Sequence, residues 1–360
     1  MERIKVLVVD DSAFMRKLIT DILESDQNIE VVGTSRNGLD AIEKVKKLRP
    51  NVITLDIEMP IMDGIQALQN IMNDNPTPII MLSSTTKLGA ENTILAMHYG
   101  AIDFVTKPSG SISLDLEKVK DDLIQKVKSA SKANIQNLRY PSETKQLLVP
   151  ERPQASFKVE IRKMSKWSQG RNKLICIGIS TGGPRALQKL LAGFPENLDA
   201  PILIVQHMPA GFTKSLANRL NTLSKIHVKE AEEGEVIQKG TAYIAPGDFH
   251  LQVKQLGTNI VVQLNQAPPL NGHRPSVDIM FQSISQLPNY DKIAVIMTGM
   301  GSDGAQGLIE LKKKGTVKAI AESENSCIVF GMPKAAIATN LVDEVEDLEK
   351  ISQAIMKYLP

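Results

Sequence analysis

The stretch IKVLVVDD, residues 4–11, is a short apolar run that ends in two acids. Further runs of the same kind follow along the chain: IEVVGTS (29–35), NVITLDI (51–57), PIIMLSS (78–84) and DFVTKP (103–108). Segments with helical spacing of apolar residues separate them. Strands that alternate with helices predict a parallel sheet covered by helices on both faces. The first part of the chain is therefore expected to fold as an α/β domain.

Charged and hydroxyl side chains stand at the ends of these runs. Asp10 and Asp11 follow the first run, Asp56 lies near the end of the third, Ser83 near the end of the fourth and Lys107 near the end of the fifth. The carboxyl ends of parallel strands meet at one edge of a sheet, so these groups are expected to gather there. Three neighbouring carboxylates repel one another unless a cation joins them, and oxygen ligands suit Mg²⁺. Lys107 and Ser83 would then hold an anion built on one carboxylate.

These positions carry a resemblance to a known family. Through Asp10-Asp11, Asp56, Met59-Pro60, Asp63-Gly64, Ser83 and Lys107-Pro108, residues 1–108 resemble a response-regulator receiver domain, a flavodoxin-like module that is phosphorylated on aspartate. The resemblance implies that Asp56 accepts the phosphoryl group. A phosphoryl group adds nearly two negative charges, which can bias a two-state surface.

The resemblance also implies a metal site and a switch. Asp11 and Asp56 would bind Mg²⁺ directly, Asp10 through water and Glu58 through its backbone carbonyl. The switch residues implied in the same way are Ser83, Phe104 and Lys107.

The segment from 108 to 170 differs in composition from the rest of the chain. It carries twelve basic and seven acidic residues, whereas the whole chain has a net charge of +2. Its first part, DLEKVKDDLIQKVKSASKA (115–133), predicts a closing helix, and the rest, with three prolines, is typical of a linker. We favour a solvated linker over a nucleic-acid site. The expected boundaries are 1–125 for the receiver domain, 126–170 for the linker and 171–360 for the second domain.

Composition limits the class of protein. A chain of 360 residues accommodates two or three domains. Two cysteines, Cys176 and Cys327, exclude a disulfide framework. No run of about 18 apolar residues occurs, and the first residues carry charges within their apolar stretch, so neither a membrane span nor a signal peptide is expected. We expect a cytoplasmic protein that neither binds nucleic acid nor inserts into a membrane.

A second alternation of strands and helices begins near Asn172. Its apolar runs are KLICIGIS (173–180), PILIVQHM (201–208), TAYIAPGD (241–248), NIVVQLN (259–265), DKIAVIMTGM (291–300) and TVKAIAES (316–323). They predict a doubly wound, mostly parallel α/β sheet. Ser180 stands in a G-x-S-x-G turn between a strand and a helix, and His207 and Asp303 follow two other strands. One edge of the sheet would thus collect the hydroxyl, imidazole and carboxylate of acyl transfer.

Other interpretations of these residues are open. A G-x-S-x-G turn also suits phosphate binding or packing, and a lone histidine at a strand end is usually structural. GMGSDG (299–304) matches the G-x-G-x-x-G pattern of dinucleotide-binding domains, with Glu322 about twenty residues further on. Asp303 argues against a dinucleotide, because it would stand in the loop that receives an anionic pyrophosphate. The order Ser…His…Asp also differs from that of the α/β-hydrolases.

Six motifs cover nearly the whole second domain: GISTGGP (178–184), QHMPAGFTKSLANRL (206–220), APGDFH (245–250), NGHRPSVD (271–278), TGMGSDG (298–304) and CIVFGMPKAA (327–336). Through them, residues 172–360 resemble the catalytic domain of the chemotaxis protein-glutamate methylesterases, the CheB family. The resemblance implies that Ser180 is the nucleophile, His207 the general base and acid, and Asp303 the group that orients His207.

The same resemblance implies an oxyanion hole and a set of pocket-lining residues around the three side chains. The family builds its oxyanion hole from backbone groups, and the amide of Met300 is our candidate donor, with Thr181 as a supporting contact. His250, His273 and residues 274–278 are expected to line the pocket.

The resemblance implies a substrate and partners as well. The substrate would be a glutamyl γ-methyl ester on a methyl-accepting chemoreceptor, with release of methanol, and glutamine deamidation would use the same machinery. A chemotaxis histidine kinase would be the phosphodonor. No cofactor is expected for the esterase chemistry, whereas Mg²⁺ belongs to the receiver domain. We expect the unphosphorylated receiver domain to cover the edge of the sheet that holds Ser180. The alternative is a second domain that only binds a receptor or kinase.

Overall fold

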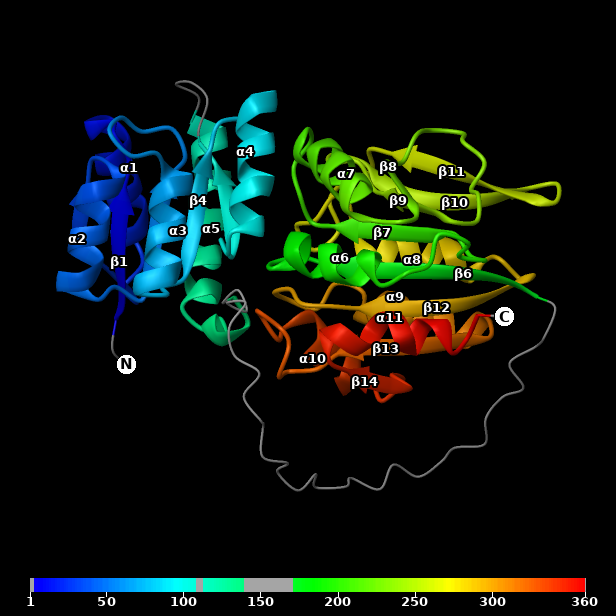
Figure 1. Ribbon diagram of the computed structural model, residues 1–360. Helices are drawn as coiled ribbons and strands as arrows, with labels where there is room; N and C mark the ends of the chain where they lie inside the picture. The colour runs from blue at the N-terminus through cyan, green and yellow to red at the C-terminus, as the bar shows by residue number, and fades with distance from the viewer. Residues whose placement is uncertain (1–2, 108–112, 139–170, 360) are drawn as a thin grey trace, which may run out of the picture.

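A computed structural model describes residues 3–107, 113–138 and 171–359. The chain forms two α/β domains that lie side by side (Figure 1). Most of the expected linker, residues 139–170, lies outside the described residues. Within the described part of the chain, no helix combines the length and the apolarity that crossing a membrane would require.

The first domain has the expected flavodoxin-like α/β fold. Within the residues described, its parallel sheet has the strand order β2-β1-β3-β4-β5. The strands are β1 (Ile4–Val9), β2 (Ile29–Ser35), β3 (Val52–Asp56), β4 (Ile79–Ser83) and β5 (Asp103–Thr106). The helices are α1 (Ala13–Glu24), α2 (Gly38–Leu48), α3 (Gly64–Asp74), α4 (Lys87–His98) and α5 (Ser113–Ala130).

Several helices of this domain begin at side chains that cap them. Ser12, Asn37, Asp63 and Thr86 each accept a hydrogen bond from a backbone N–H in the first turn of α1, α2, α3 and α4. Such caps pair amides that the helix itself leaves unbonded. They fix where each helix starts, on the chain segments that follow the carboxyl ends of β1, β2, β3 and β4.

Helix α5 extends beyond the expected domain boundary at residue 125. It continues to Ala130, because Val127 and Ala130 are fully buried against the domain. A short 3₁₀ helix, η1 (Ile135–Leu138), follows it.

The second domain confirms the predicted, mostly parallel α/β fold. Within the described residues, its main sheet is parallel with the order β14-β13-β12-β6-β7-β9-β8. These strands are β6 (Asn172–Ile179), β7 (Ile202–Gln206), β8 (His227–Glu230), β9 (Thr241–Ile244), β12 (Tyr290–Ile296), β13 (Val317–Glu322) and β14 (Glu344–Glu346). The helices are α6 (Gly183–Ala192), α7 (Phe212–Leu223), α8 (Val277–Ser285), α9 (Ala305–Lys314), α10 (Met332–Ala338) and α11 (Leu348–Met356).

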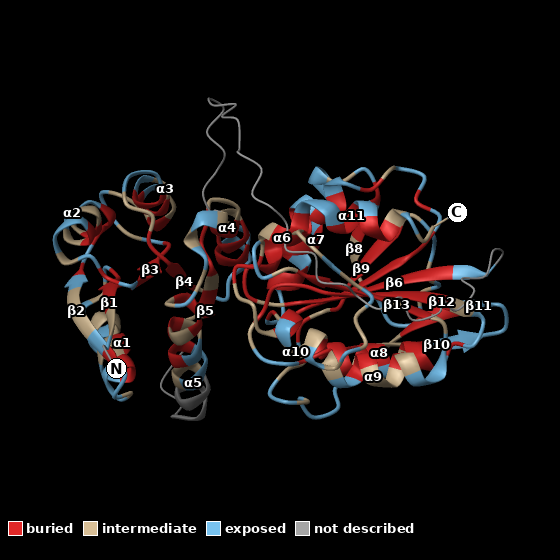
Figure 2. Ribbon diagram, turned by 90° about the horizontal axis from the view of Figure 1, so that it is seen from below, coloured by how far each residue is buried: buried red, intermediate tan, exposed pale blue. Residues whose placement is uncertain are grey.

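One predicted strand lies outside this sheet. The run NIVVQLN forms β11 (Asn259–Asn265), which pairs antiparallel with β10 (His250–Leu256). The hairpin packs against α8 with Leu251, Val253 and Val262 buried. The central strands of the main sheet are buried on both faces, whereas the edge strands β8 and β14 are partly exposed. The outer sides of the helices are exposed (Figure 2).

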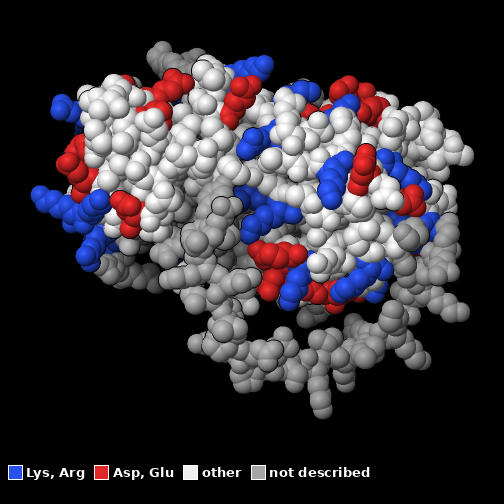
Figure 3. Space-filling model, viewed as in Figure 1, with Lys and Arg blue, Asp and Glu red and all other residues white. Residues whose placement is uncertain are grey.

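The two domains share one apolar core. Helix α4 of the first domain packs against α6 and α7 of the second. Phe104 stacks on Phe212, with ring centroids 4.4 Å apart, and both side chains are buried. The carboxyl ends of β6 and β7 point toward the first domain (Figure 1). On the face that Figure 3 shows, acidic and basic side chains are interspersed.

Candidate active site

Ser180 lies in the tight turn between β6 and α6. Gly182 reaches a positive φ of 79° in this turn, a conformation that glycine adopts without strain. The Ser180 N–H donates to the carbonyl of Thr298 (3.0 Å), and its carbonyl accepts a hydrogen bond from the Gln206 side chain (3.0 Å). The turn is therefore held by both neighbouring strands, β12 and β7.

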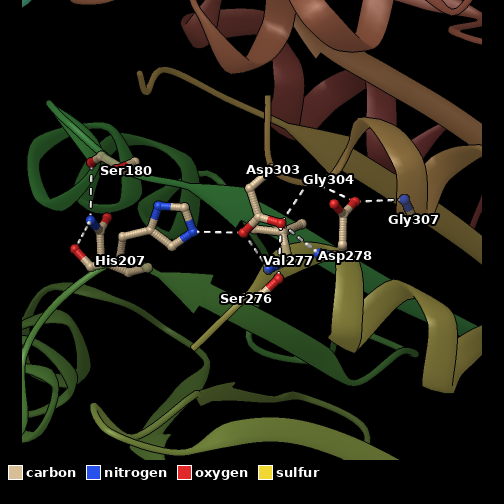
Figure 4. Close-up of polar contacts among 9 residues, drawn as sticks. Ser180, His207, Ser276, Val277, Asp278, Asp303, Gly304 and Gly307 are labelled. Carbon is tan, nitrogen blue, oxygen red and sulfur yellow. Dashed lines mark hydrogen bonds and ion pairs between the residues drawn. The ribbon is translucent and has the colours of Figure 1, made fainter. Parts of the chain in front are cut away.

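His207 directly follows β7 and lies between Ser180 and Asp303 (Figure 4). Its Nε2 is 2.8 Å from Oδ2 of Asp303. Its Nδ1 is buried and has no hydrogen-bond partner among the described residues. A ring whose Nε2–H donates to a carboxylate has an Nδ1 that is free to accept a proton.

Asp303 lies in a cage of hydrogen-bond donors. Its carboxylate accepts bonds from the N–H of Val277 (2.7 Å), the N–H of Asp278 (3.0 Å) and the hydroxyl of Ser276 (2.9 Å). Burial raises the pKa of Asp303, but the bond and charge of His207 and the backbone donors outweigh burial and lower the pKa to about 2. Asp303 is thus held as an anion against Nε2 of His207.

The carboxyl of Asp278 lies next to Asp303 and has a different environment. Its Oδ1 accepts hydrogen bonds from the N–H groups of Gly304 (2.9 Å) and Gly307 (2.6 Å) at the start of α9. Burial raises the pKa of Asp278 to about 6, and the nearby Asp303 adds to the rise. The first turns of α8 and α9 therefore bind each other's carboxyl groups (Figure 4).

The residues around Ser180 line a cavity of about 310 Å³, which we call the Ser180 cavity. From the second domain it is lined by Ser180, Thr181, His207, His273, Arg274 and Met300, among others. From the first domain it is lined by Asp103, Asp122, Gln125 and Lys126. The two domains together therefore enclose the expected nucleophile and base.

Two interdomain hydrogen bonds lie directly beside Ser180. The hydroxyl of Thr181 donates to Oδ2 of Asp103 (2.6 Å). The N–H of Gly182 donates to the carbonyl of Ile102 (3.1 Å). The first domain thus bonds to polar groups of the turn that holds Ser180 as well as covering it.

The expected pocket-lining histidines occupy two positions. The His273 ring stacks on the His207 ring, with centroids 3.9 Å apart and planes 6° apart. Burial lowers the pKa of His273 to about 4. The ring that stacks on His207 is therefore neutral near pH 7. His250 is fully buried, and its Nε2 bonds to the carbonyl of Pro268 (3.2 Å).

The first domain brings its acids together at the carboxyl ends of β1 and β3. Asp10, Asp11 and Asp56 place carboxylate oxygens within 4.8 Å of one another. Lys107 Nζ is 2.8 Å from both Asp10 and Asp56. Burial raises the pKa of Asp56 to about 6. Three carboxylates this close, two of them buried, form a donor set that fits Mg²⁺.

The other residues implied by the receiver resemblance surround this cluster or lie at the interface. The Glu58 N–H donates to Asp56 (3.3 Å). Ser83 is buried and bonded to α4, through the Gly89 carbonyl (3.2 Å) and the Thr93 hydroxyl (2.7 Å). Phe104 is buried at the domain interface, with Lys126 Nζ 5.3 Å from its ring centroid.

The structure does not support the dinucleotide interpretation of GMGSDG. Asp303 faces His207, and Glu322 is fully buried and bonded to the N–H of Thr298 (2.8 Å). Both carboxyls are therefore engaged by groups of the protein itself. Packing accounts for the first glycine of the G-x-G-x-x-G pattern. A Cβ on Gly299 would lie only 2.7 Å from Cβ of Ser180, so a larger residue would not fit there.

Sequence reasoning missed several contributors to this site. Asp103, Asp122, Gln125 and Lys126 belong to the other domain, and no pattern along the chain connects them with Ser180. Gln206 supports the carbonyls of Ser180 and His207 and stands in the motif that contains His207, so the motif could have indicated it.

Comparison with known proteins places both domains in described families. The family profile for CheB methylesterase matches residues 175–355, and that for the response regulator receiver domain matches residues 6–117. A protein of Halalkalibacterium halodurans named protein-glutamate methylesterase/protein-glutamine glutaminase is 58% identical over 99% of this chain and 98% of its own length. A Bacillus subtilis protein of the same name is 49% identical over 98% of this chain and 97% of its own.

A solved structure is similar to the second domain. The crystal structure of the Thermotoga maritima CheB methylesterase catalytic domain is 43% identical and has a TM-score of 0.50, and the match covers 52% of this chain and 99% of that one.

Proposed function

Since this chain belongs to the CheB methylesterase family, we propose that Ser180, His207 and Asp303 are the residues with which it carries out its reaction. The chain is a phosphorylation-regulated protein-glutamate methylesterase and protein-glutamine glutaminase of chemotaxis adaptation. The observation that supports the triad most strongly is the bond between His207 Nε2 and Asp303, which leaves Nδ1 as the basic nitrogen in the cavity of Ser180.

The proposed reaction proceeds in two steps. Ser180 Oγ attacks the γ-carbonyl of the methylated glutamate while His207 Nδ1 accepts its proton, and the proton then passes to the departing methanol. Water, deprotonated by His207, hydrolyses the glutamyl ester on Ser180 and releases the free carboxylate. Asp303 stabilises the imidazolium that forms in each step. With glutamine as substrate, ammonia leaves in place of methanol.

Backbone amides are the proposed donors for the negative oxygen of the intermediate. Met300 lines the Ser180 cavity, and its N–H is our candidate, with Thr181 as a supporting contact. The absence of a side chain on Gly299 allows this loop to approach Ser180 closely. Preorganised amides of this kind typically contribute about 10²–10³-fold to the rate. We propose no cofactor for this chemistry.

Regulation is proposed to act through the wall that the receiver domain contributes to the Ser180 cavity. Asp56 is the proposed phosphoacceptor, with Lys107, Ser83 and Phe104 as switch residues. Asp10, Asp11, Asp56 and the Glu58 carbonyl would hold Mg²⁺, which supplies charge neutralisation for phosphoryl transfer. In the unphosphorylated state the receiver domain excludes a protein substrate and engages the N–H of Gly182. Phosphorylation would loosen this packing.

The proposed substrates are methylated glutamates and glutamines on the cytoplasmic bundle of methyl-accepting chemoreceptors. A histidine kinase of the same pathway is the proposed phosphodonor. The protein would act in the cytoplasm, without nucleic acid and without inserting into the membrane. The proposed domain division is a receiver domain, a linker and a catalytic domain from residue 171 onward.

The test is methanol release from receptor membranes methylated with a labelled methyl group. The full chain is expected to release methanol slowly alone and faster with acetyl phosphate and Mg²⁺. A second domain that only binds receptors would release none under either condition, which would overturn the proposal.

A further inference from the structure

Glu322 is a buried carboxyl to which the proposed reaction assigns no role. It is the last residue of β13 and is fully buried. Its Oε2 accepts a hydrogen bond from the N–H of Thr298 (2.8 Å), and its Oε1 accepts one from the hydroxyl of Ser326 (3.0 Å). Burial raises the pKa of Glu322 to about 7. A carboxyl kept in an unfavourable environment requires a structural or functional reason.

Thr298 connects the turn that holds Ser180 to the loop that carries Met300. Its carbonyl accepts the N–H of Ser180 (3.0 Å), and its hydroxyl donates to the carbonyl of Thr181 (3.0 Å). The next residue, Gly299, begins the loop that carries Met300. The position of the Thr298 backbone therefore sets the distance between the nucleophile and the proposed oxyanion donor.

The neighbouring strand does not provide the acceptor for Thr298. The pairing of β12 with β13 ends at Ile296 and Ala321, two residues before Thr298. The Glu322 side chain takes the place that a strand carbonyl would hold, and its contact fixes the N–H of Thr298 from the side opposite Ser180.

We propose that Glu322 is a positioning residue for the esterase reaction, which holds the Thr298 backbone so that Ser180 and the Met300 amide face the same carbonyl carbon. This inference rests on the proposed function of Ser180. Glu322 contacts no reacting atom and acts only through Thr298. Both the ionised and the protonated carboxyl offer an oxygen to Thr298, so what matters is the acceptor and not the charge.

Two conservative variants separate the effect of the acceptor oxygen of Glu322 from the effect of its charge. E322Q keeps an oxygen for Thr298 and offers its amide to Ser326, so its kcat is expected within about twofold of wild type. E322D withdraws the carboxylate by one methylene, and the buried N–H of Thr298 is left unpaired. Its kcat is expected to fall about 5-fold to 100-fold with KM unchanged, since receptor binding is not affected. S326A is the matched control, because it removes another hydrogen-bond partner of Glu322 and leaves the Thr298 contact in place, and it is expected to keep the wild-type kcat.

The experiment measures methanol release by the phosphorylated full chain over a range of methylated receptor concentrations, well below each variant's melting temperature. Wild-type kcat in E322D would overturn the inference. A loss in E322Q as large as that in E322D would also overturn it, because an acceptor oxygen for the Thr298 N–H would then not be sufficient. If E322D does not fold, E322M takes its place with the same expectation, since it fills a similar volume without an acceptor. An inactive wild-type chain would instead overturn the proposed function.

Discussion

Asp303 and Asp278 exchange backbone hydrogen bonds across the first turns of two helices. Asp303 accepts the N–H of Asp278 (3.0 Å), and Asp278 accepts the N–H of Gly304 (2.9 Å), the residue that follows Asp303. The amides at a helix N-terminus favour negative charge, so each helix stabilises a carboxyl supplied by the other. The loop that carries Asp303, the hydrogen-bond partner of His207, is thus held by both helices.

The exchange predicts a pH-dependent effect of D278N on stability. The pKa of Asp278 is about 6 in the folded chain, against 3.8 for an ordinary aspartate. Its contribution to stability is therefore fully present below about pH 4 and is lost as the pH rises through about 6. Asparagine keeps the oxygen that Gly304 and Gly307 need and cannot ionise. We expect the melting temperature of D278N relative to wild type to rise by about 2–4 °C between about pH 5 and pH 8.

Differential scanning calorimetry at the two pH values provides this measurement. D74N is the matched control, because Asp74 lies on the surface and pairs only loosely with Lys46 (3.5 Å). A melting-temperature difference for D278N that stays constant across the pH range would contradict the prediction.

Replacing Asp303 by asparagine is expected to lower kcat by roughly 10³–10⁴-fold without unfolding the chain. The asparagine amide would donate to Nε2 of His207 and so place the ring proton on Nδ1, where it blocks acceptance of the Ser180 proton. Methanol release measures the effect. S276A removes one hydrogen bond to Asp303 and retains the His207 contact, and a loss of less than about tenfold is expected for it. Similar losses in both variants would argue against a tautomer effect.

The interdomain bond from Thr181 to Asp103 predicts an activating substitution. D103A removes the acceptor (2.6 Å), which weakens the closed arrangement of the two domains. Methanol release by the unphosphorylated chain is expected to rise about threefold to tenfold, whereas that of the phosphorylated chain stays unchanged. D21A, which removes an exposed ion pair with Lys17, is the control. Unchanged basal release in D103A would show that this contact does not restrain the enzyme.

The acidic cluster of the first domain predicts that activation depends on Asp56 and on a divalent cation. D56N is expected to keep the basal methanol release and to lose the increase with acetyl phosphate. Chelation of Mg²⁺ is expected to abolish the same increase in the wild-type chain, because the close carboxylates need a cation to accept a phosphoryl group. Activation of D56N by acetyl phosphate would assign the phosphorylation to another residue.

The common edge of Ser180, His207 and Asp303 could be predicted from sequence because parallel strands leave their carboxyl ends on one side. The same rule brings Asp10, Asp11 and Asp56 together. The pairing of β11 could not be predicted, because apolar periodicity indicates a strand and not its partner. Helix α5 ends at Ala130, within the predicted helical stretch 115–133 but beyond the expected domain boundary at 125, because tertiary packing buries Val127 and Ala130.

From the sequence we expected the first domain to cover the edge of the sheet that holds Ser180, but not which of its residues line the Ser180 cavity. Which residues form it depends on how the surfaces of two separately folded domains fit, and Asp103 and Lys126 stand in no motif with Ser180. The role of Glu322 was hidden for a related reason, since its contact with Thr298 joins two strands that are adjacent only in the folded sheet.

The most direct test of the central claim compares S180A with the wild-type chain for methanol release from methylated receptor membranes in the presence of acetyl phosphate and Mg²⁺. With the nucleophile removed, the rate is expected to fall by at least about 10³-fold while receptor binding and the melting temperature stay unchanged. Substantial methanol release by the folded S180A chain would contradict a reaction through a Ser180 ester and, with it, the proposed triad.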